Sequence, residues 1–165
     1  GIMGEGNTRF FLTGFAKLDA LVNGKDSRTT ILEAMGLNPE LPTILYAPTG
    51  GKYNSLDEMG EDLICAVRDG GNWNVIIKPH DHPKKQVNWM EKLSYLEGDR
   101  VGLIRDFDIV KYLAIADLLL TDASSVSMEY TLRDKPMVFI DVPKLLQNVM
   151  DRDLALRQRR FRSAC

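Results

Sequence analysis

The sequence predicts an α/β fold, a Rossmann-like three-layer α/β/α domain built on a parallel sheet. Two observations predict it. Five short apolar runs alternate with amphipathic helical patterns, and turns rich in glycine, serine or other polar residues follow several of these runs. Runs that are short and almost continuously apolar are typical of parallel strands covered on both faces. Their alternation with helices implies right-handed crossovers and helices on both sides of the sheet.

The strands are expected at residues 43–47, 74–78, 100–104, 117–121 and 136–140. Between them, helices are expected from residue 55 onward and at 84–96, 109–116 and 125–133. Ser55 and Glu58 have the spacing of a capping box, so Ser55 is the expected N-cap of the first of these helices. Its apolar face is expected to carry Met59, Leu63, Ala66 and Val67.

The segment before residue 41 follows a different pattern. It predicts a strand at 10–14 and short helices at 16–22 and 29–35. We interpret residues 1–40 as a lead-in from an N-terminal domain that the chain lacks, because the first residues do not resemble a native N-terminus. Residues 41–165 form the Rossmann-like domain, with one or two further helices expected over 143–162.

Length and charge restrict the possible functions. A chain of 165 residues allows one well-buried domain, and its net charge of −2 gives no general attraction to nucleic acid. The two cysteines make no disulfide framework, because Cys65 lies in an apolar helical pattern and Cys165 is the last residue, and this favours a reducing cytosol. The sequence shows no signal peptide and no apolar run of about 20 residues. The arginines of residues 152–162 are typical of a solvated helix face, with a peripheral membrane contact of the full-length protein as the alternative.

The turn after the fourth strand is the strongest candidate site. Thr121, Asp122, Ser124 and Ser125 lie between an apolar strand and a helix start, where backbone N–H groups and hydroxyls favour an anion such as phosphate. Ordinary helix capping is the alternative explanation for serine and aspartate there. Glu129, one turn further, is placed to accept hydrogen bonds from sugar hydroxyls or to face a neighbouring helix.

Two other strand ends should meet the same edge of the sheet. Thr49, Gly50, Gly51 and Lys52 follow the first strand, where glycines allow close backbone approach and a lysine can meet phosphate; an ordinary flexible turn is equally compatible.

Lys78 and His80 end the second strand, and His80 is the candidate catalytic residue, as a hydrogen-bond donor or general acid. We expect no metal and no other cofactor, since the His80 and His82 pair lacks a third ligand; His82 is interpreted as a solvent-facing loop residue.

Several of these segments together resemble the CDP-glycerol glycerophosphotransferases that build teichoic-acid-type polymers. The segments are residues 13–19, 43–49, 78–80 and 106–136, and 107–126 is the strongest of them. The likeness covers most of residues 9–142.

The resemblance implies the C-terminal half of a GT-B fold, in which two Rossmann-like domains face each other and the C-terminal one binds the nucleotide-activated donor. It implies CDP-glycerol or a similar donor, with His80, Thr121, Ser124 and Ser125 at its pyrophosphate. The acceptor and its base would belong mainly to the missing N-terminal domain, so we expect this chain alone to be inactive.

Two other functions stay open. A GT-B glycosyltransferase or epimerase using a UDP-sugar shares the architecture, although the epimerases carry a glycine-rich turn and adjacent glutamates where this chain has Ser124 and Ser125. A regulatory module of flavodoxin-like fold, or a donor domain that only scaffolds a polymerase, is the non-enzymatic alternative. A receiver domain would need an acidic pair after its first strand, and this chain has Pro48 and Thr49 there.

Overall fold

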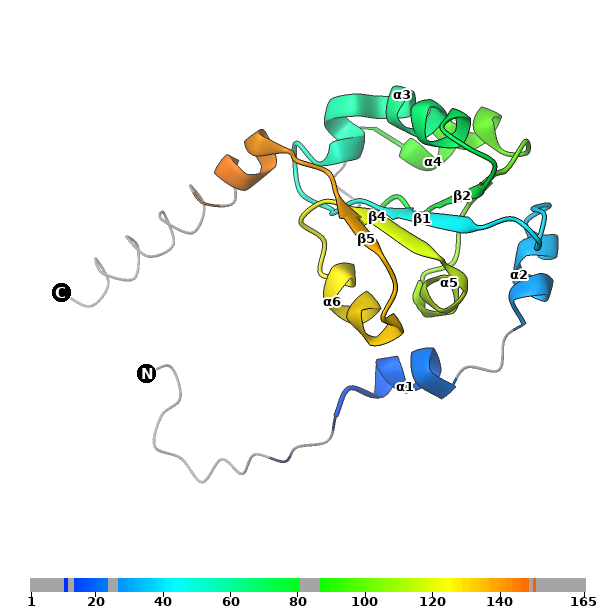
Figure 1. Cartoon of the computed structure of the whole chain (residues 1–165). Helices are drawn as coiled ribbons and strands as arrows, with labels where there is room; N and C mark the ends of the chain where they lie inside the picture. The colour runs from blue at the N-terminus through cyan, green and yellow to red at the C-terminus, as the bar shows by residue number, and fades with distance from the viewer. Residues whose placement is uncertain (1–10, 12–13, 24–26, 81–86, 149, 151–165) are drawn as a thin grey trace.

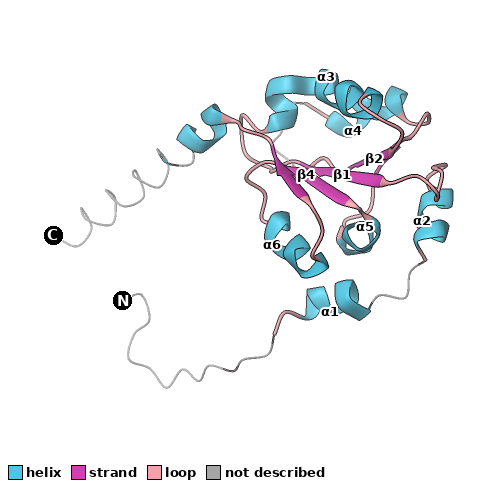
Figure 2. Ribbon diagram, viewed as in Figure 1, coloured by secondary structure: helices cyan, strands magenta, loops and turns pink. Residues whose placement is uncertain are grey.

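A computed structural model describes residues 11, 14–23, 27–80, 87–148 and 150 of the chain. Its centre is a five-stranded sheet with helices on both faces (Figures 1 and 2). The strands are β1 (Thr43–Ala47), β2 (Asn74–Ile77), β3 (Val101–Leu103), β4 (Leu118–Thr121) and β5 (Met137–Phe139). The helices are α1 (Ala16–Asn23), α2 (Arg28–Ala34), α3 (Ser55–Asp69), α4 (Trp89–Leu93), α5 (Val110–Ile115) and α6 (Val126–Tyr130), with 3-10 turns η1 (Ser94–Leu96) and η2 (Thr131–Arg133).

The strand order is β3-β2-β1-β4-β5, and every pair of neighbouring strands is parallel. The chain builds outward from β1 through β2 to β3, then crosses to the other side of β1 for β4 and β5. Strand order therefore reverses between β1 and β4, and ligands of such sheets bind at the carboxyl ends of the strands beside this point. The predicted α/β class and parallel sheet are confirmed.

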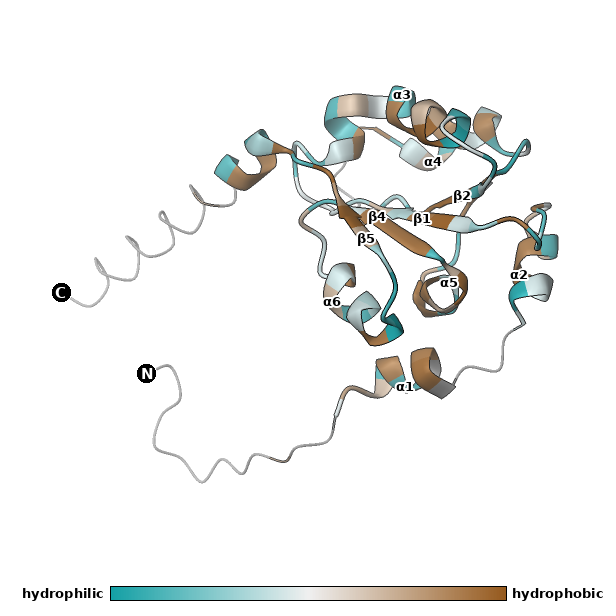
Figure 3. Ribbon diagram, in the orientation of Figure 1, coloured by the Kyte–Doolittle hydropathy of each residue, from teal (hydrophilic) through white to brown (hydrophobic). Residues whose placement is uncertain are grey.

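Alternate residues of the central strands enter two separate cores, as the two-residue period of a strand requires. Leu45 and Leu119 are fully buried on the side covered by α1, α2, α5 and α6. Tyr46 and Ile77 are buried on the opposite side, under α3 and α4. The strands are accordingly apolar along most of their length (Figure 3). Leu21 of α1 and Leu32 of α2 belong to the first core, so the segment before residue 41 packs on this sheet.

Helix α3 differs from the prediction in its cap and its buried face. Asn54, not Ser55, is the N-cap, and its side chain accepts a hydrogen bond from the Asp57 N–H at 2.9 Å. Gly60 adopts φ 62° inside the helix and kinks it, so residues before and after it do not share one continuous face. Leu56 and Ile64 are buried, whereas Met59 is 40% exposed.

Most of the other predicted elements are found with somewhat different bounds, and α1 extends one residue further than expected while α2 begins and ends one residue earlier. Four of the five strands lose one or two terminal residues, and the helix expected at 84–96 begins at Trp89, with residues 84–86 outside the described part. Phe11 and Gly14 are not in a strand, and the rest of the strand predicted at 10–14 lies outside the described residues. Residues 143–148 are helical, and 151–165 are not described.

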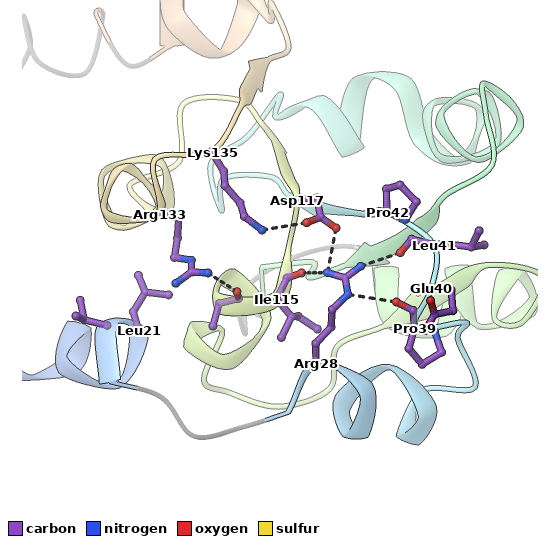
Figure 4. A pocket seen from close by; sticks show the side chains of 12 residues that line it. Leu21, Arg28, Pro39, Glu40, Leu41, Pro42, Ile115, Asp117, Arg133 and Lys135 are labelled. Carbon is purple, nitrogen blue, oxygen red and sulfur yellow. Dashed lines mark hydrogen bonds and ion pairs between the residues drawn. The ribbon is translucent and has the colours of Figure 1, made fainter.

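An ionic network fastens the amino ends of β1 and β4 (Figure 4). The Arg28 guanidinium donates to the Leu41 carbonyl at 2.7 Å and to Thr43 Oγ1 at 3.0 Å, and it pairs with Asp117 at 3.0 Å. Asp117 also accepts from the Thr43 N–H and from Lys135 Nζ, each at 2.9 Å. Arg28, Asp117 and Lys135 line a cavity of about 750 Å³. Burial alone would raise the pKa of Asp117, but its hydrogen bonds and the two cations outweigh burial and lower that pKa.

This network predicts a component of acid denaturation. Because the folded-state pKa of Asp117 lies below the unfolded value of about 3.9, its stabilising effect is present above that value. It is lost as pH falls through the folded pKa. Asp117→Asn should make the fall in unfolding free energy below about pH 4 shallower, measured by urea unfolding at a series of pH values. The exposed Asp62→Asn is the control, and an unchanged slope in Asp117→Asn would contradict the assignment.

Because the sheet is buried, truncating a leucine inside it and truncating an exposed leucine should lower the unfolding free energy by different amounts. Leu119→Ala, in the centre of β4, should lower the unfolding free energy by about 2–5 kcal/mol, because it leaves a cavity in a closed core. Leu132→Ala removes a side chain that is 53% exposed and should change it by about 0.5 kcal/mol or less. Urea unfolding of both variants measures the contrast, and equal losses would show that β4 is not central.

Candidate active site

A cavity of about 610 Å³ opens at the carboxyl edge of the sheet. The ends of β1 and β2, the loop after β3, the turn after β4, helix α6 and the first turn of α1 all contribute to its lining. It therefore lies where the strand order reverses, which is the place that this topology favours for a ligand. The lining residues are Ala16, Lys17, Ala47, Pro48, Lys78, Pro79, His80, Phe107, Asp108, Ile109, Ser124, Ser125, Val126 and Glu129.

Five of the residues singled out in the sequence lie together in this lining: Lys78, His80, Ser124, Ser125 and Glu129. They come from the ends of β2 and β4 and from α6. These five residues supply one ammonium group, an imidazole, two hydroxyls and one carboxylate. Such a set can hold a molecule that carries both phosphate and hydroxyl groups.

The Ser124 and Ser125 hydroxyls have few bonds that compete with a ligand. Ser125 is the N-cap residue of α6, but its side chain makes no capping hydrogen bond. Ser124 Oγ lies 3.5 Å from the Val126 N–H, at the limit of a weak bond. Helix capping alone therefore does not account for the two serines.

Thr121 and Asp122, from the same turn, do not line the cavity. Their hydrogen bonds fix the positions of the neighbouring strand end and loop. Asp122 is 2% exposed, and its carboxylate accepts hydrogen bonds from the Thr49 N–H at 2.7 Å, the Ser55 N–H at 2.9 Å and Ser55 Oγ at 2.8 Å. Thr121 Oγ1 donates to the Ala47 carbonyl at 2.6 Å. These bonds join the end of β4 to the end of β1 and to the start of α3.

The buried hydroxyl of Tyr46 extends this network. It lies 2.7 Å from Ser55 Oγ, and because Ser55 Oγ donates to Asp122, the tyrosine donates to the serine. Burial raises the pKa of Tyr46 far above its ordinary value, so the phenol stays protonated and keeps this donor role. The Asp122 network is therefore part of the fold that supports the cavity.

The loop after β1 approaches His80 through its backbone. A Cβ atom added at Gly50 would lie 2.7–2.9 Å from three atoms of the His80 ring, a separation that real Cβ atoms do not show. A Cβ at Gly51 would meet two methyl groups, that of Leu145 at 3.1 Å and that of Thr49 at an ordinary contact distance of 3.8 Å. Thr49 and Gly51 are half-buried and Lys52 is exposed, and none of these loop residues lines the cavity. Gly50 thus acts on the site by leaving room for the imidazole.

Lys17 and Phe107 also line the cavity, although the sequence analysis did not predict them as site residues. Lys17 of α1 pairs with Glu129, its Nζ lying 2.8 Å from both carboxylate oxygens. Phe107 is 98% exposed at the cavity. The sequence indicated the helix that carries Lys17, but not that this side chain reaches Glu129 of α6. Asp108 accepts a hydrogen bond from the Val110 N–H at 3.0 Å and also lines the cavity.

The described residues hold no group of three histidine, cysteine or acidic side chains arranged for a metal ion. His82 lies outside that part of the chain. None of the helices that the structure describes is long and apolar enough to cross a bilayer.

The contact between Gly50 and His80 is testable by substitution. Gly50→Ala should displace the imidazole and lower the unfolding free energy by about 1–3 kcal/mol, as overpacking does. Gly51→Ala should lower the unfolding free energy by less, because the flexible Leu145 side chain that it would contact can move aside. Imidazole NMR resonances assigned to His80 should shift in the first variant and stay in place in the second. An unmoved His80 signal in Gly50→Ala would contradict the packing.

Sequence comparison identifies relatives. The family described as CDP-Glycerol:Poly(glycerophosphate) glycerophosphotransferase matches residues 5–144. A teichoic acid ribitol-phosphate primase of Bacillus spizizenii is 30% identical over 148 residues, covering 85% of this chain and 36% of the relative. A teichoic acid glycerol-phosphate primase of Bacillus subtilis is 33% identical over 100 residues, covering 58% and 24%. The chain therefore spans about a third of these relatives, or less.

Solved structures share the fold. The wall teichoic acid polymerase TagF, in a variant soaked with CDPG, superposes with a TM-score of 0.57 at 24% identity, covering 77% of this chain and 30% of that one. A putative UDP-N-acetylglucosamine 2-epimerase from Listeria monocytogenes gives a TM-score of 0.53 at 25% identity, covering 74% and 33%. The sheet alone thus does not separate these two classes, but the family match extends over the whole sheet. The chain belongs to the CDP-glycerol:poly(glycerophosphate) glycerophosphotransferase family.

Proposed function

We propose that this chain is the donor-binding part of a transferase that moves glycerol phosphate, or a related polyol phosphate, from a CDP-activated donor to a cell-envelope polymer. The observation that carries the proposal is the cavity at the carboxyl edge, where the Ser124–Ser125 turn, Lys78, His80 and Glu129 meet. Family membership supplies the class of donor.

The proposed pose follows from the chemistry of the lining. The donor diphosphate lies against the Ser124–Ser125 turn, within reach of Lys78 and His80, because hydroxyls and cationic groups complement phosphate oxygens. Glu129 accepts hydrogen bonds from ribose hydroxyls. Thr49, Gly50, Gly51, Lys52, Thr121 and Asp122, also expected at the donor, act in this pose by shaping and holding the loops around it.

The proposed reaction is a displacement at phosphorus. An acceptor hydroxyl attacks the phosphorus of the polyol phosphate group, and CMP departs with the bridging oxygen. His80 stabilises the charge that develops on the departing phosphate by donating a hydrogen bond. The base that takes the acceptor proton belongs to an N-terminal domain in the full-length protein, facing this cavity. Residues 1–165 alone should accordingly bind the donor without transferring it.

We further propose that the full-length protein works in the cytoplasm, where nucleotide-activated donors are made. A peripheral contact with the membrane would bring it to a membrane-linked acceptor. The arginine-rich stretch at 152–162 is the segment whose charge suits such a contact, and it lies outside the described residues.

Calorimetric titration with CDP-glycerol, CDP, UDP and UDP-N-acetylglucosamine tests the donor class. Cytidine ligands should bind at least tenfold more tightly than their uridine counterparts, a difference of about 1.4 kcal/mol. Tighter binding of the uridine ligands would instead indicate that this chain belongs to an enzyme that uses sugar nucleotides. No binding of any of the four at millimolar concentration would contradict a donor-binding function.

Two truncations test the pose. His80→Ala and Ser124→Ala should each weaken CDP binding about tenfold, because each removes a charge-assisted or hydroxyl contact to phosphate. Ser94→Ala, in η1 and away from the cavity lining, is the matched control and should bind CDP like the wild type. Wild-type affinity in both cavity variants would place the nucleotide elsewhere.

A further inference from the structure

Helix α1 precedes the strands of the Rossmann-like domain, yet it brings a charged side chain into the cavity. Leu21 is 2% exposed in the core shared with α5 and α6, and Leu18 packs against the same core. This apolar packing fixes the rotation of α1 about its axis. Lys17, in its first turn, consequently reaches the cavity and α6 (Figure 1 shows α1 and α6 on the same side of the sheet).

Lys17 and Glu129 form a symmetric ion pair inside the lining. The ammonium nitrogen lies 2.8 Å from each carboxylate oxygen, and the glutamate side chain is only 14% exposed. A carboxylate with so little contact with solvent is weakly screened by water. The pair therefore both fixes the orientation of Glu129 and neutralises it.

The charge balance of the cavity gives this pairing a consequence for a ligand. Among the residues that the structure describes, the charged ones in the lining, leaving histidine aside, are Lys17, Lys78, Asp108 and Glu129. With Lys17 present they balance, and without it the acidic groups outnumber the one remaining lysine. A diphosphate would then approach a site of its own sign, and repulsion between like charges close together disfavours binding.

We propose that Lys17 is a positioning and charge-compensating residue of the donor site. It holds the Glu129 carboxylate toward sugar hydroxyls and cancels the charge that would repel the neighbouring diphosphate. This inference rests on the proposed function, and it assigns to α1 a part in ligand binding. The segment before residue 41 is thereby a component of the site as well as a lead-in to it.

The test compares CDP, which carries the diphosphate, with cytidine, which does not, by NMR titration of the whole chain. Lys17→Met should weaken CDP binding at least fivefold and cytidine binding by a smaller factor. Lys17→Arg, which keeps the charge, should stay within about threefold of the wild type for CDP. The loss in Lys17→Met should also shrink at high salt, since screening weakens the repulsion.

Making Lys17→Met in a Glu129→Gln variant tests whether Lys17 acts by compensating the glutamate charge or only by supporting the fold. In Glu129→Gln the carboxylate is gone, so the further change Lys17→Met should weaken CDP binding by a factor at least threefold smaller than in the wild-type background. Asp19→Asn, an exposed charge change on α1 outside the lining, is the control and should leave CDP affinity unchanged. Melting temperatures of all variants report whether α1 stays packed.

Three results would overturn the inference. These are an equal loss for CDP and cytidine in Lys17→Met, an equal loss in both Glu129 backgrounds, and wild-type affinity in Lys17→Met. In each of these cases the wild-type chain still binds CDP, and the proposed function stands. Failure of the wild-type chain to bind any nucleotide would instead overturn the proposed function, and this inference with it.

Discussion

The buried carboxylate of Asp122 is the interaction on which the candidate site depends. It stands at the end of β4 and binds the Thr49 N–H, the Ser55 N–H and the Ser55 hydroxyl. Three donors on one carboxylate anchor both ends of the loop between β1 and α3. That loop in turn lies against His80 through Gly50. A residue that does not line the cavity thus sets the position of residues that do, and its neighbours Ser124 and Ser125 are left to meet a ligand.

The two edges of the sheet are used differently. At the amino edge, Arg28, Asp117 and Lys135 satisfy one another and the backbone carbonyls at the strand ends, so the polar groups there stabilise the fold. At the carboxyl edge, hydroxyls, an imidazole and charged groups surround an open cavity. Between them lie the two apolar cores, which hold the strands in register. The charged groups beside the amino-edge cavity are thus paired with one another and with the backbone, whereas at the carboxyl edge the Ser124 and Ser125 hydroxyls make few bonds within the protein.

The strands and the fold class could be predicted because parallel strands buried on both faces leave short apolar runs, as at residues 43–47. The cap of α3 could not, since Asn54 and Ser55 are both good N-caps and tertiary contacts with Asp122 and Tyr46 decide between them. The turn after β4 shows the same limit. Asp122 and Ser124 are both polar, and only the folded chain places one in the interior and the other at the cavity. The pairing of Lys17 with Glu129 joins residues distant in sequence, which no local pattern indicates.

A crystal structure of this chain soaked with CDP-glycerol would test the central claim most directly. We expect the diphosphate between the Ser124–Ser125 turn and His80, with the ribose hydroxyls near Glu129. A nucleotide bound instead at the amino edge, in the cavity lined by Arg133 and Lys135, would contradict the assignment of the site. So would a fully occupied ligand that leaves His80 and the serine turn untouched.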